Sequence, residues 1–316
     1  RKRGALMRNF VGHSSLIENF KNRCSNGNLS HAQLISGEDG IGKSILAEIL
    51  GKLILNGDLN REYVDIINYR PSKASFGVDD VREIIDEVNK KPFEGDKKVI
   101  IIHQGNKLTI QAQNALLKTI EEPPTEVYII ILCESLELIL DTIKSRCEIY
   151  KLTPLTKEEL YKYIAIKGYD YSEEEKASAI AFSEGIPGRI DRYFSDTELQ
   201  ELRDKIVDLL LHLINSEIEA ILEKEEQLVS YKQNKEEVIN LLSSFIRDIL
   251  VNKEVYNENL IINRDKIKEI EILTNEMSFK KLNKMILGLQ EARKNIKNNV
   301  SWAMTVRIMI MDFMEG

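Results

Sequence analysis

The chain has 316 residues, of which 43% are hydrophobic and 30% are charged, a balance typical of a globular protein with two or three domains. No run of residues approaches the roughly 20 consecutive apolar positions that a membrane-spanning helix needs, and no apolar signal segment follows the basic amino end. We therefore expect a cytoplasmic protein with no membrane partner. The net charge of −7 argues against broad, nonspecific DNA binding by this chain alone, because neutralising phosphates requires clustered Lys and Arg side chains.

Residues 7–152 are predicted to alternate between strands and helices. The strongest strand signals are two continuous runs of β-branched residues, which are typical of buried parallel strands. Alternation of this kind indicates an α/β fold, with a parallel sheet between helices. The predicted elements are a strand over 32–36, a helix over 45–55, a strand over 99–102, a helix over 110–122 that two prolines end, and a strand over 127–132.

Residues 153–197 are predicted to form a small helical domain. Thr156 with Glu159, and Ser172 with Glu175, have the spacing of capping boxes at helix starts. The Gly-Ile-Pro-Gly sequence at 185–188 marks a turn before a further helix.

Residues 198–316 are predicted to be helical almost throughout. Apolar side chains such as Ile206, Leu209 and Leu210 recur at helical spacing, which is more often the signature of an internal core than of an interface. The many charged residues of this region are interpreted as solvated helix faces.

A phosphate-binding loop is the strongest single motif. Residues 37–44 read Gly-Glu-Asp-Gly-Ile-Gly-Lys-Ser, the full GxxxxGKS pattern, between a predicted strand and a predicted helix. Glycines let backbone N–H groups close around phosphates, Lys43 would reach the β- and γ-phosphates, and Ser44 would ligate Mg²⁺. The alternative is a loop kept for its shape without bound nucleotide. The predicted ATP site consists of Gly37, Gly40, Gly42, Lys43 and Ser44.

Acidic residues are missing where an ATPase of this type needs them. One carboxylate should follow the strand over 99–102 to support the Mg²⁺ shell, and a second should polarise the attacking water. His103 and Gln104 stand there instead. We therefore expect no efficient hydrolysis of ATP by this chain. His103 is interpreted as an ordinary strand-end histidine rather than as a metal ligand.

Residues 114–124, Asn-Ala-Leu-Leu-Lys-Thr-Ile-Glu-Glu-Pro-Pro, closely resemble the NALLKTLEEPP signature of bacterial clamp-loader subunits, which are members of the AAA+ superfamily. Phe-Val-Gly-His at 10–13 and Ser-Arg-Cys at 145–147 agree with this resemblance. The resemblance implies a RecA-like AAA+ domain over 7–152, a helical lid over 153–197 and a helical oligomerisation collar over 198–316. It also implies that Val11 belongs to the nucleotide site.

Within this family, the chain resembles delta-prime-type subunits rather than ATP-hydrolysing gamma/tau-type subunits. His103 and Gln104 favour the delta-prime type, as does the turn that contains Gly188 and Arg189. The gamma/tau type places a nucleotide-sensing arginine at the position of Gly188, so Arg189 lies one residue further on. Cys133 lies near a sensor position that is normally threonine. The alternative within the family is an active gamma/tau-type ATPase.

The resemblance implies that Arg146 is an arginine finger, which points into the ATP site of an adjacent subunit. The alternative is a surface arginine in a salt bridge. The implied partners are gamma/tau and delta subunits in a hetero-oligomer, the sliding clamp, and primer-template DNA reached through the complex. The implied role is in DNA replication, within the DNA polymerase III holoenzyme.

No zinc or other metal bound by protein ligands alone is expected. Related subunits commonly carry a four-cysteine zinc module after the first helix, but residues 53–70 contain no cysteine. The three cysteines, Cys24, Cys133 and Cys147, are widely separated. Two functions outside the clamp-loader family are alternatives. A small-molecule P-loop kinase would explain the phosphate-binding loop but would leave residues 114–124 without a role. A freestanding DNA-binding protein is disfavoured by the net negative charge of the chain.

Overall fold

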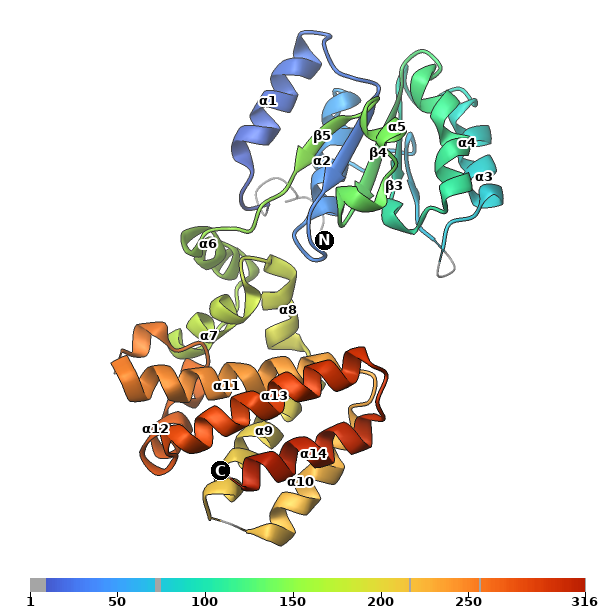
Figure 1. Ribbon diagram of the computed structural model, residues 1–316. Coiled ribbons are helices and arrows are strands. Elements are labelled where there is room, and N and C mark those ends of the chain that lie inside the picture. Colours follow the sequence, from blue (N-terminus) through green and yellow to red (C-terminus); the bar gives the residue numbers. More distant parts are fainter. Residues whose placement is uncertain (1–9, 72–74, 216, 256, 316) are drawn as a thin grey trace. The chain divides into compact units, whose positions relative to one another are not determined.

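The computed structural model of the chain describes residues 10–71, 75–215, 217–255 and 257–315, and it divides into two compact units. The first unit comprises the chain as far as Tyr169 together with Glu184–Arg189. The second unit comprises Asp170–Ser183 and the chain from Ile190 onward. Figure 1 shows a sheet with flanking helices in the first unit and helices alone in the second.

A five-stranded parallel sheet forms the centre of the first unit, in the order β2-β3-β4-β1-β5. Every residue of β1, β3 and β4 is buried, which explains why their sequences are apolar at nearly every position rather than at alternate ones. The α/β class predicted from the sequence is confirmed. The strands are β1 (Ala32–Ser36), β2 (Ile66–Tyr69), β3 (Lys98–Ile102), β4 (Val127–Cys133) and β5 (Glu148–Lys151).

Each face of the sheet has its own hydrophobic core. Ile100 and Ile102 of β3 pack with the core of one face, whereas Val99 and Ile101 pack with that of the other, as the alternation of side chains along a strand requires. Helices α3 and α4 cover the first face and α1 and α2 the second (Figure 1). Their bounds are Ser14–Ser25 for α1, Lys43–Ile54 for α2, Val78–Val88 for α3 and Ile110–Glu121 for α4.

Short elements connect this sheet to the rest of the first unit. The 3-10 helices η1 (Gly105–Lys107) and η2 (Leu136–Leu138) follow β3 and β4, and α5 (Asp141–Lys144) precedes β5. Helix α6 (Lys157–Lys167) begins with the capping box predicted at Thr156, whose hydroxyl accepts the backbone N–H of Glu159.

The second unit has one hydrophobic core, which extends from Leu199 to Phe313. The predicted helical character of the tail is confirmed. Residues 198–316 carry no strand in the part that the structure describes. The division between the two units falls within α8. The helices are α7 (Glu173–Ser183), α8 (Pro187–Ser195), α9 (Thr197–Asn215), α10 (Ile218–Ser230), α11 (Lys235–Val255), η3 (Glu258–Leu260), η4 (Arg264–Lys266), α12 (Ile267–Glu276), α13 (Phe279–Lys297) and α14 (Trp302–Met314).

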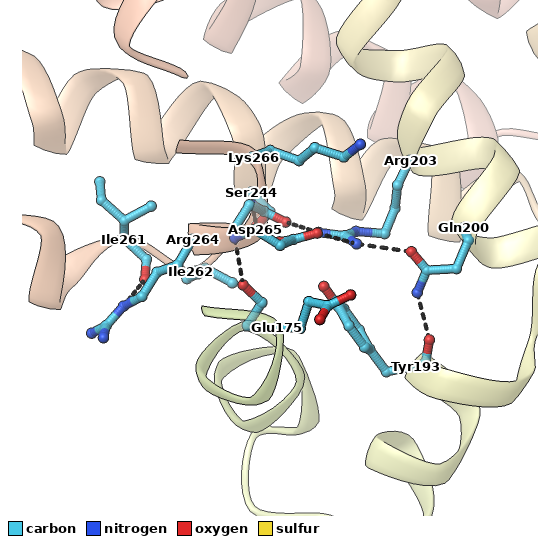
Figure 2. Close-up of polar contacts among 12 residues, drawn as sticks. Glu175, Tyr193, Gln200, Arg203, Ser244, Ile261, Ile262, Arg264, Asp265 and Lys266 are labelled. Carbon is cyan, nitrogen blue, oxygen red and sulfur yellow. Dashed lines mark hydrogen bonds and ion pairs between the residues drawn. The ribbon is translucent and has the colours of Figure 1, made fainter. Parts of the chain in front are cut away.

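A buried polar network joins α7 and α8 to the tail within this unit. The guanidinium of Arg203, 1% exposed, donates two hydrogen bonds of 2.9 Å to the carboxylate of Asp265. It also lies over the ring of Tyr193, 4.7 Å from its centroid. Figure 2 shows Gln200 reaching from Arg203 to the backbone of Tyr193. Ser178 of α7 accepts the backbone N–H of Asp265. Much of the segment predicted as a lid, 153–197, therefore packs with the tail, while the three-domain division stays a prediction.

Over the ranges described, we find no helix that has both the length and the apolar character to cross a membrane.

Candidate functional site

The loop between β1 and α2 has the geometry of an anion cradle. The backbone N–H of Gly37 donates to the carbonyl of Cys133 at the end of β4, at 3.2 Å. Gly40 and Gly42 have φ angles of +83° and +106°, a region that glycine adopts without the strain that a Cβ brings. Helix α2 begins at Lys43, directly after Gly42. The loop thus brings backbone N–H groups to the amino end of a 12-residue helix, where the helix dipole favours negative charge.

Lys43 spans the loop from the first turn of α2. Its ammonium donates to the carbonyl oxygens of Gly37 at 2.7 Å and Glu38 at 2.8 Å. Burial lowers the pKa of Lys43, and the charges of Asp39 and Glu134 oppose this change. The cation is therefore held at the loop by backbone dipoles and by the field of nearby acids.

Ser44 is hydrogen-bonded to a neutral histidine. The Ser44 hydroxyl lies 3.2 Å from Nδ1 of His103, and Nε2 of His103 lies 2.8 Å from Oδ1 of Asn68. Because a carboxamide oxygen only accepts, we assign the ring proton to Nε2, and Nδ1 accepts from Ser44. Burial, together with the charge of Arg70, lowers the pKa of His103 to about 4. His103 is therefore uncharged at neutral pH.

The last residues of β3 and β4 hold no carboxylate, but Glu134 directly follows β4. Gln104 follows His103 in a left-handed conformation, with φ of +52°, and is exposed. Cys133 ends β4 fully buried, and burial raises the pKa of its thiol to about 11. Glu134 comes next and is exposed, and its charge acts on Lys43. Glu134 and Asn68 were not among the residues predicted for this site.

The turn before α8 lies against the phosphate loop. The backbone N–H of Gly188 donates to the carbonyl of Gly40 at 3.0 Å. A Cβ at position 188 would lie 2.8 Å from the Cα of Gly40, so no side chain fits there without a backbone shift. Arg189 instead carries the charge of this turn, since it forms ion pairs with Glu38 at 2.8 Å and Glu184 at 2.6 Å.

The amino-terminal segment also lies against the loop. The ring of Phe10 lies 3.2 Å from the place that a Cβ would take on Gly42. Val11 follows, half-buried, and Gly12 packs so closely that a Cβ there would meet the side chain of Leu155. These contacts bring Val11 near the loop through its neighbours in sequence.

Arg146 lies in a different environment, just past α5. Its guanidinium donates to Glu121 at 2.5 Å and to the carbonyl of Thr142 at 2.9 Å, and its side chain is 34% exposed. Glu121 is the last residue of α4 and lies in the signature over 114–124. The polar contacts found for Arg146 in the described ranges are with Glu121, Thr142 and Ser145. The fold therefore does not join Arg146 to residues 37–44 of its own chain.

Within the described ranges, no group of three or more His, Cys, Asp or Glu side chains is arranged to hold a metal ion. Cys24, Cys133 and Cys147 are free thiols.

Two family models match most of the chain. The model described as "DNA polymerase III, delta subunit" matches residues 12–156, and the one described as "DNA polymerase III, delta subunit, C terminal" matches residues 208–313. The first covers the sheet and the phosphate loop, and the second covers most of the helical tail.

Individual proteins similar to this chain are also DNA polymerase III subunits or related to them. DNA polymerase III subunit delta' of Bacillus subtilis is 24% identical over 91% of this chain and 92% of its own length. DNA polymerase III subunit gamma of Buchnera aphidicola is 30% identical over 57% of this chain, and the match spans 55% of that protein. A DNA polymerase III gamma subunit-related protein of Thermotoga maritima has a similar fold, with a TM-score of 0.55, 17% identity and coverage of 95% of this chain and 98% of that one.

Proposed function

Because the chain belongs to the family of DNA polymerase III clamp-loader subunits, we propose that it acts as the delta-prime-like member of that complex. In this role it holds ATP weakly or without turnover. It supplies Arg146 to the ATP site of a neighbouring subunit, and the complex places the sliding clamp on primer-template DNA.

One observation carries the proposal: a neutral imidazole occupies the position beside Ser44 where a hydrolysing ATPase needs a carboxylate. The Ser44–His103 hydrogen bond and the pKa of about 4 leave this position without charge at neutral pH. An uncharged imidazole hydrogen-bonded on both nitrogens has no free site with which to take a proton from water.

The loop itself fits a nucleotide phosphate. Gly40 and Gly42 take positive φ angles in the turn of the loop, and Lys43 would exchange its two carbonyl contacts for phosphate oxygens. Val11 would lie at the border of the site. ATP with Mg²⁺ supplies the anion that this cradle attracts. The Ser44 hydroxyl oxygen could ligate the ion, but His103 would add no negative charge behind it. The residues therefore fit phosphate binding better than metal-assisted hydrolysis.

Arg146 supports a role in trans. It lies outside the polar contacts of its own phosphate loop, it is partly exposed, and it follows the short helix α5, where Thr142 accepts from its guanidinium. A guanidinium donates two parallel hydrogen bonds to phosphate oxygens, which makes arginine the suitable residue for charge that develops on a transferred phosphoryl group. The proposed partners are gamma/tau-type and delta-type subunits, with the tail as the proposed assembly domain.

The test measures binding and turnover on the same purified chain. A fluorescent ATP analogue should bind, and Lys43→Ala should weaken that binding at least about tenfold, since a charge-assisted contact is worth roughly 1.5–3 kcal/mol. Lys91→Ala removes an exposed lysine from the same unit and should leave binding unchanged. No steady release of phosphate is expected from the wild-type chain.

The second candidate is an active gamma/tau-type ATPase. The complete loop over 37–44 favours it, as does the 30% identity to a gamma subunit. Steady phosphate release by the isolated wild-type chain that disappears in Lys43→Ala would establish this alternative and overturn the proposal.

A further inference from the structure

A groove runs between α11 and α13, which pack against each other in the second unit. One half is an apolar hollow of about 430 Å³, lined on α11 by Ile246, Leu250 and Val251 and on α13 by Ile286 and Leu289. Ile246 and Leu250 are four residues apart on α11, and Ile286 and Leu289 are three apart on α13, so one face of each helix lines the hollow. Leu250, Val251 and Ile286 are only half-buried, so the protein's own core does not fully cover them.

The other half of the groove is basic. A hollow of about 690 Å³ lies between the amino end of α11 and the carboxyl end of α13, where it is lined by Lys235, Arg293, Lys294 and Lys297 and by one acid, Glu236. Arg293 lines both hollows, and its guanidinium reaches from α13 to Asn240 and Ser243 of α11, so the two halves adjoin at this side chain. In a chain of net charge −7, this end of the groove has a local excess of positive charge.

Of the four cations, only Lys294 is paired with an acid among the described residues. Arg293 donates to the neutral side chains of Asn240 and Ser243, and Lys294 has an exposed contact of 3.3 Å with Glu291. In the described part of the chain, neither the side chain of Lys235 nor that of Lys297 has a hydrogen bond or an ion pair.

Helix electrostatics explain only part of this pattern. Lys294 and Lys297 lie in the last turn of α13, where a cation favourably meets the negative end of the helix dipole. Lys235 is the first residue of α11, where the dipole is positive and a cation is unfavourable. The helix dipole therefore does not account for Lys235, and an anion bound at this end of the groove would meet all three lysines.

We propose that this groove binds an amphipathic helix of another clamp-loader subunit, with its apolar stripe in the hollow beside Leu250 and Ile286 and carboxylates at the end beside Lys235 and Lys297. Residues 235–251 of α11 span about 24 Å at 1.5 Å per residue, enough for four turns of a partner helix. The inference rests on the proposed function, because it names the surface through which the tail joins the complex.

Two other occupants fit less well. A nucleic-acid backbone would match the lysines, but it gains nothing from the apolar half of the groove. Residues 1–3, Arg-Lys-Arg, are basic and would be repelled by Lys235 and Lys297.

The test reverses charge in the full-length chain and measures assembly with the gamma/tau-type and delta-type subunits of the same organism. Lys235→Glu/Lys297→Glu should weaken assembly at least about tenfold and remove part of its dependence on salt, since charged contacts at an interface are screened by added ions. Lys268→Glu/Lys280→Glu makes the same change of charge at exposed positions outside the groove. It should assemble like the wild type.

Two further variants test the apolar half of the groove. Val251→Thr and Ile286→Thr place a hydroxyl in the hollow and should also weaken assembly. Their thermal unfolding midpoints, compared with the wild type, show whether a loss of assembly comes from the groove or from unfolding. If unfolding accounts for the loss in the threonine variants, the charge reversals decide alone.

The outcomes distinguish a failure of the proposed function from a failure of the proposed groove. If the wild-type chain does not assemble with these subunits at all, the proposed function is wrong. If the wild type and Lys235→Glu/Lys297→Glu assemble equally well, only the groove is wrong. Fluorescence anisotropy of a labelled primer-template provides the last arm: DNA binding by the isolated wild type that the charge reversal abolishes would assign the groove to nucleic acid and overturn the inference.

Discussion

The hydroxyl of Ser44 and Nδ1 of His103 lie 3.2 Å apart, at the junction of α2 with the carboxyl end of β3. The same imidazole donates from Nε2 to Asn68 of β2. A single buried ring thus ties the helix that follows the phosphate loop to two neighbouring strands. Burial requires a neutral ring, whose Nδ1 accepts from Ser44, because a protonated ring would carry a buried charge even though its Nδ1–H could donate to the Ser44 hydroxyl oxygen.

Lowering the pH should test whether the folded protein needs a neutral His103 ring. The pKa of His103 is lowered from 6.5 to about 4 in the folded protein, so between these values the unfolded chain binds the proton and the folded chain does not. The contribution of His103 to stability is therefore complete above pH 6.5 and is lost as the pH falls toward 4, by at most about 3 kcal/mol. His103→Gln should flatten the pH dependence of the free energy of unfolding in this window, measured by urea titration.

His31→Gln is the control for that experiment, because His31 stacks on Tyr128 away from the loop. It removes a histidine without touching Ser44. An equal slope in wild type and His103→Gln would show that the lowered pKa of His103 does not contribute to acid sensitivity.

The pair formed by Arg189 and Glu38 should govern the charge of the phosphate loop. Arg189→Ala leaves Glu38 unpaired beside the site, and we expect nucleotide affinity to fall a few-fold by charge repulsion. Arg189→Ala/Glu38→Gln removes the repulsion too and should restore most of the affinity for a fluorescent ATP analogue. If the double variant stays as weak as the single one, Arg189 contacts the nucleotide itself and the repulsion account fails.

Glu121 should compete with a neighbour's phosphate for Arg146. Its carboxylate lies 2.5 Å from the guanidinium, and both side chains are partly exposed, 34% for Arg146 and 50% for Glu121. Such a pair is worth at most about 1 kcal/mol. Glu121→Gln should therefore raise the ATPase rate of the assembled complex by no more than about fivefold.

Glu122→Gln is a close control, since it makes the same chemical change one residue away, at an exposed position. A drop in rate for Glu121→Gln alone would mean that Glu121 positions the arginine instead of competing for it.

The buried pair of Arg203 and Asp265 should contribute measurably to the stability of the second unit. Burial alone would raise the pKa of Asp265, but the hydrogen bonds and charge of Arg203 outweigh it and hold that pKa below its ordinary value. Asp265→Asn leaves a guanidinium buried without its counter-ion, which costs about 3–5 kcal/mol in comparable cases. Denaturant unfolding should show this loss, whereas Asp204→Asn, at an exposed ion pair with Lys266, should cost less than about 1 kcal/mol.

The sequence predicts the centre of the sheet well and its edge poorly. The runs over 99–102 and 127–132 fall within β3 and β4, because strands buried on both faces must be apolar at every position. Strand β2 is only partly buried, so its residues carry no continuous apolar run. Asn68, the partner of His103, lies on that strand and was not predicted.

The features of the site that the sequence did not predict depend on contacts between residues far apart in the chain. The missing acids at His103 and Gln104 could be read from spacing to the phosphate loop, but the neutral state of His103 depends on strand pairing that places Asn68 beside it, 35 residues away in the chain. The contact of Gly188 with Gly40 likewise depends on the folded turn. This contact leaves no room for a side chain at position 188, so an arginine there would clash with the backbone of Gly40.

The most direct test of the central claim is the ATPase rate of the complex reassembled with Arg146→Ala, stimulated by the sliding clamp and primer-template DNA. Arginine fingers are worth about 10³–10⁵ in rate at a single site. Because other subunits keep their own catalytic groups, we expect a fall on the order of tenfold in the whole complex, with assembly intact.

Arg146→Lys should recover only part of the rate, because an ammonium lacks the planar fork of the guanidinium. Arg61→Ala breaks another exposed ion pair of the same unit and should have no effect. An Arg146→Ala complex that hydrolyses ATP and loads clamps at the wild-type rate would contradict the account and leave Arg146 as the structural partner of Glu121.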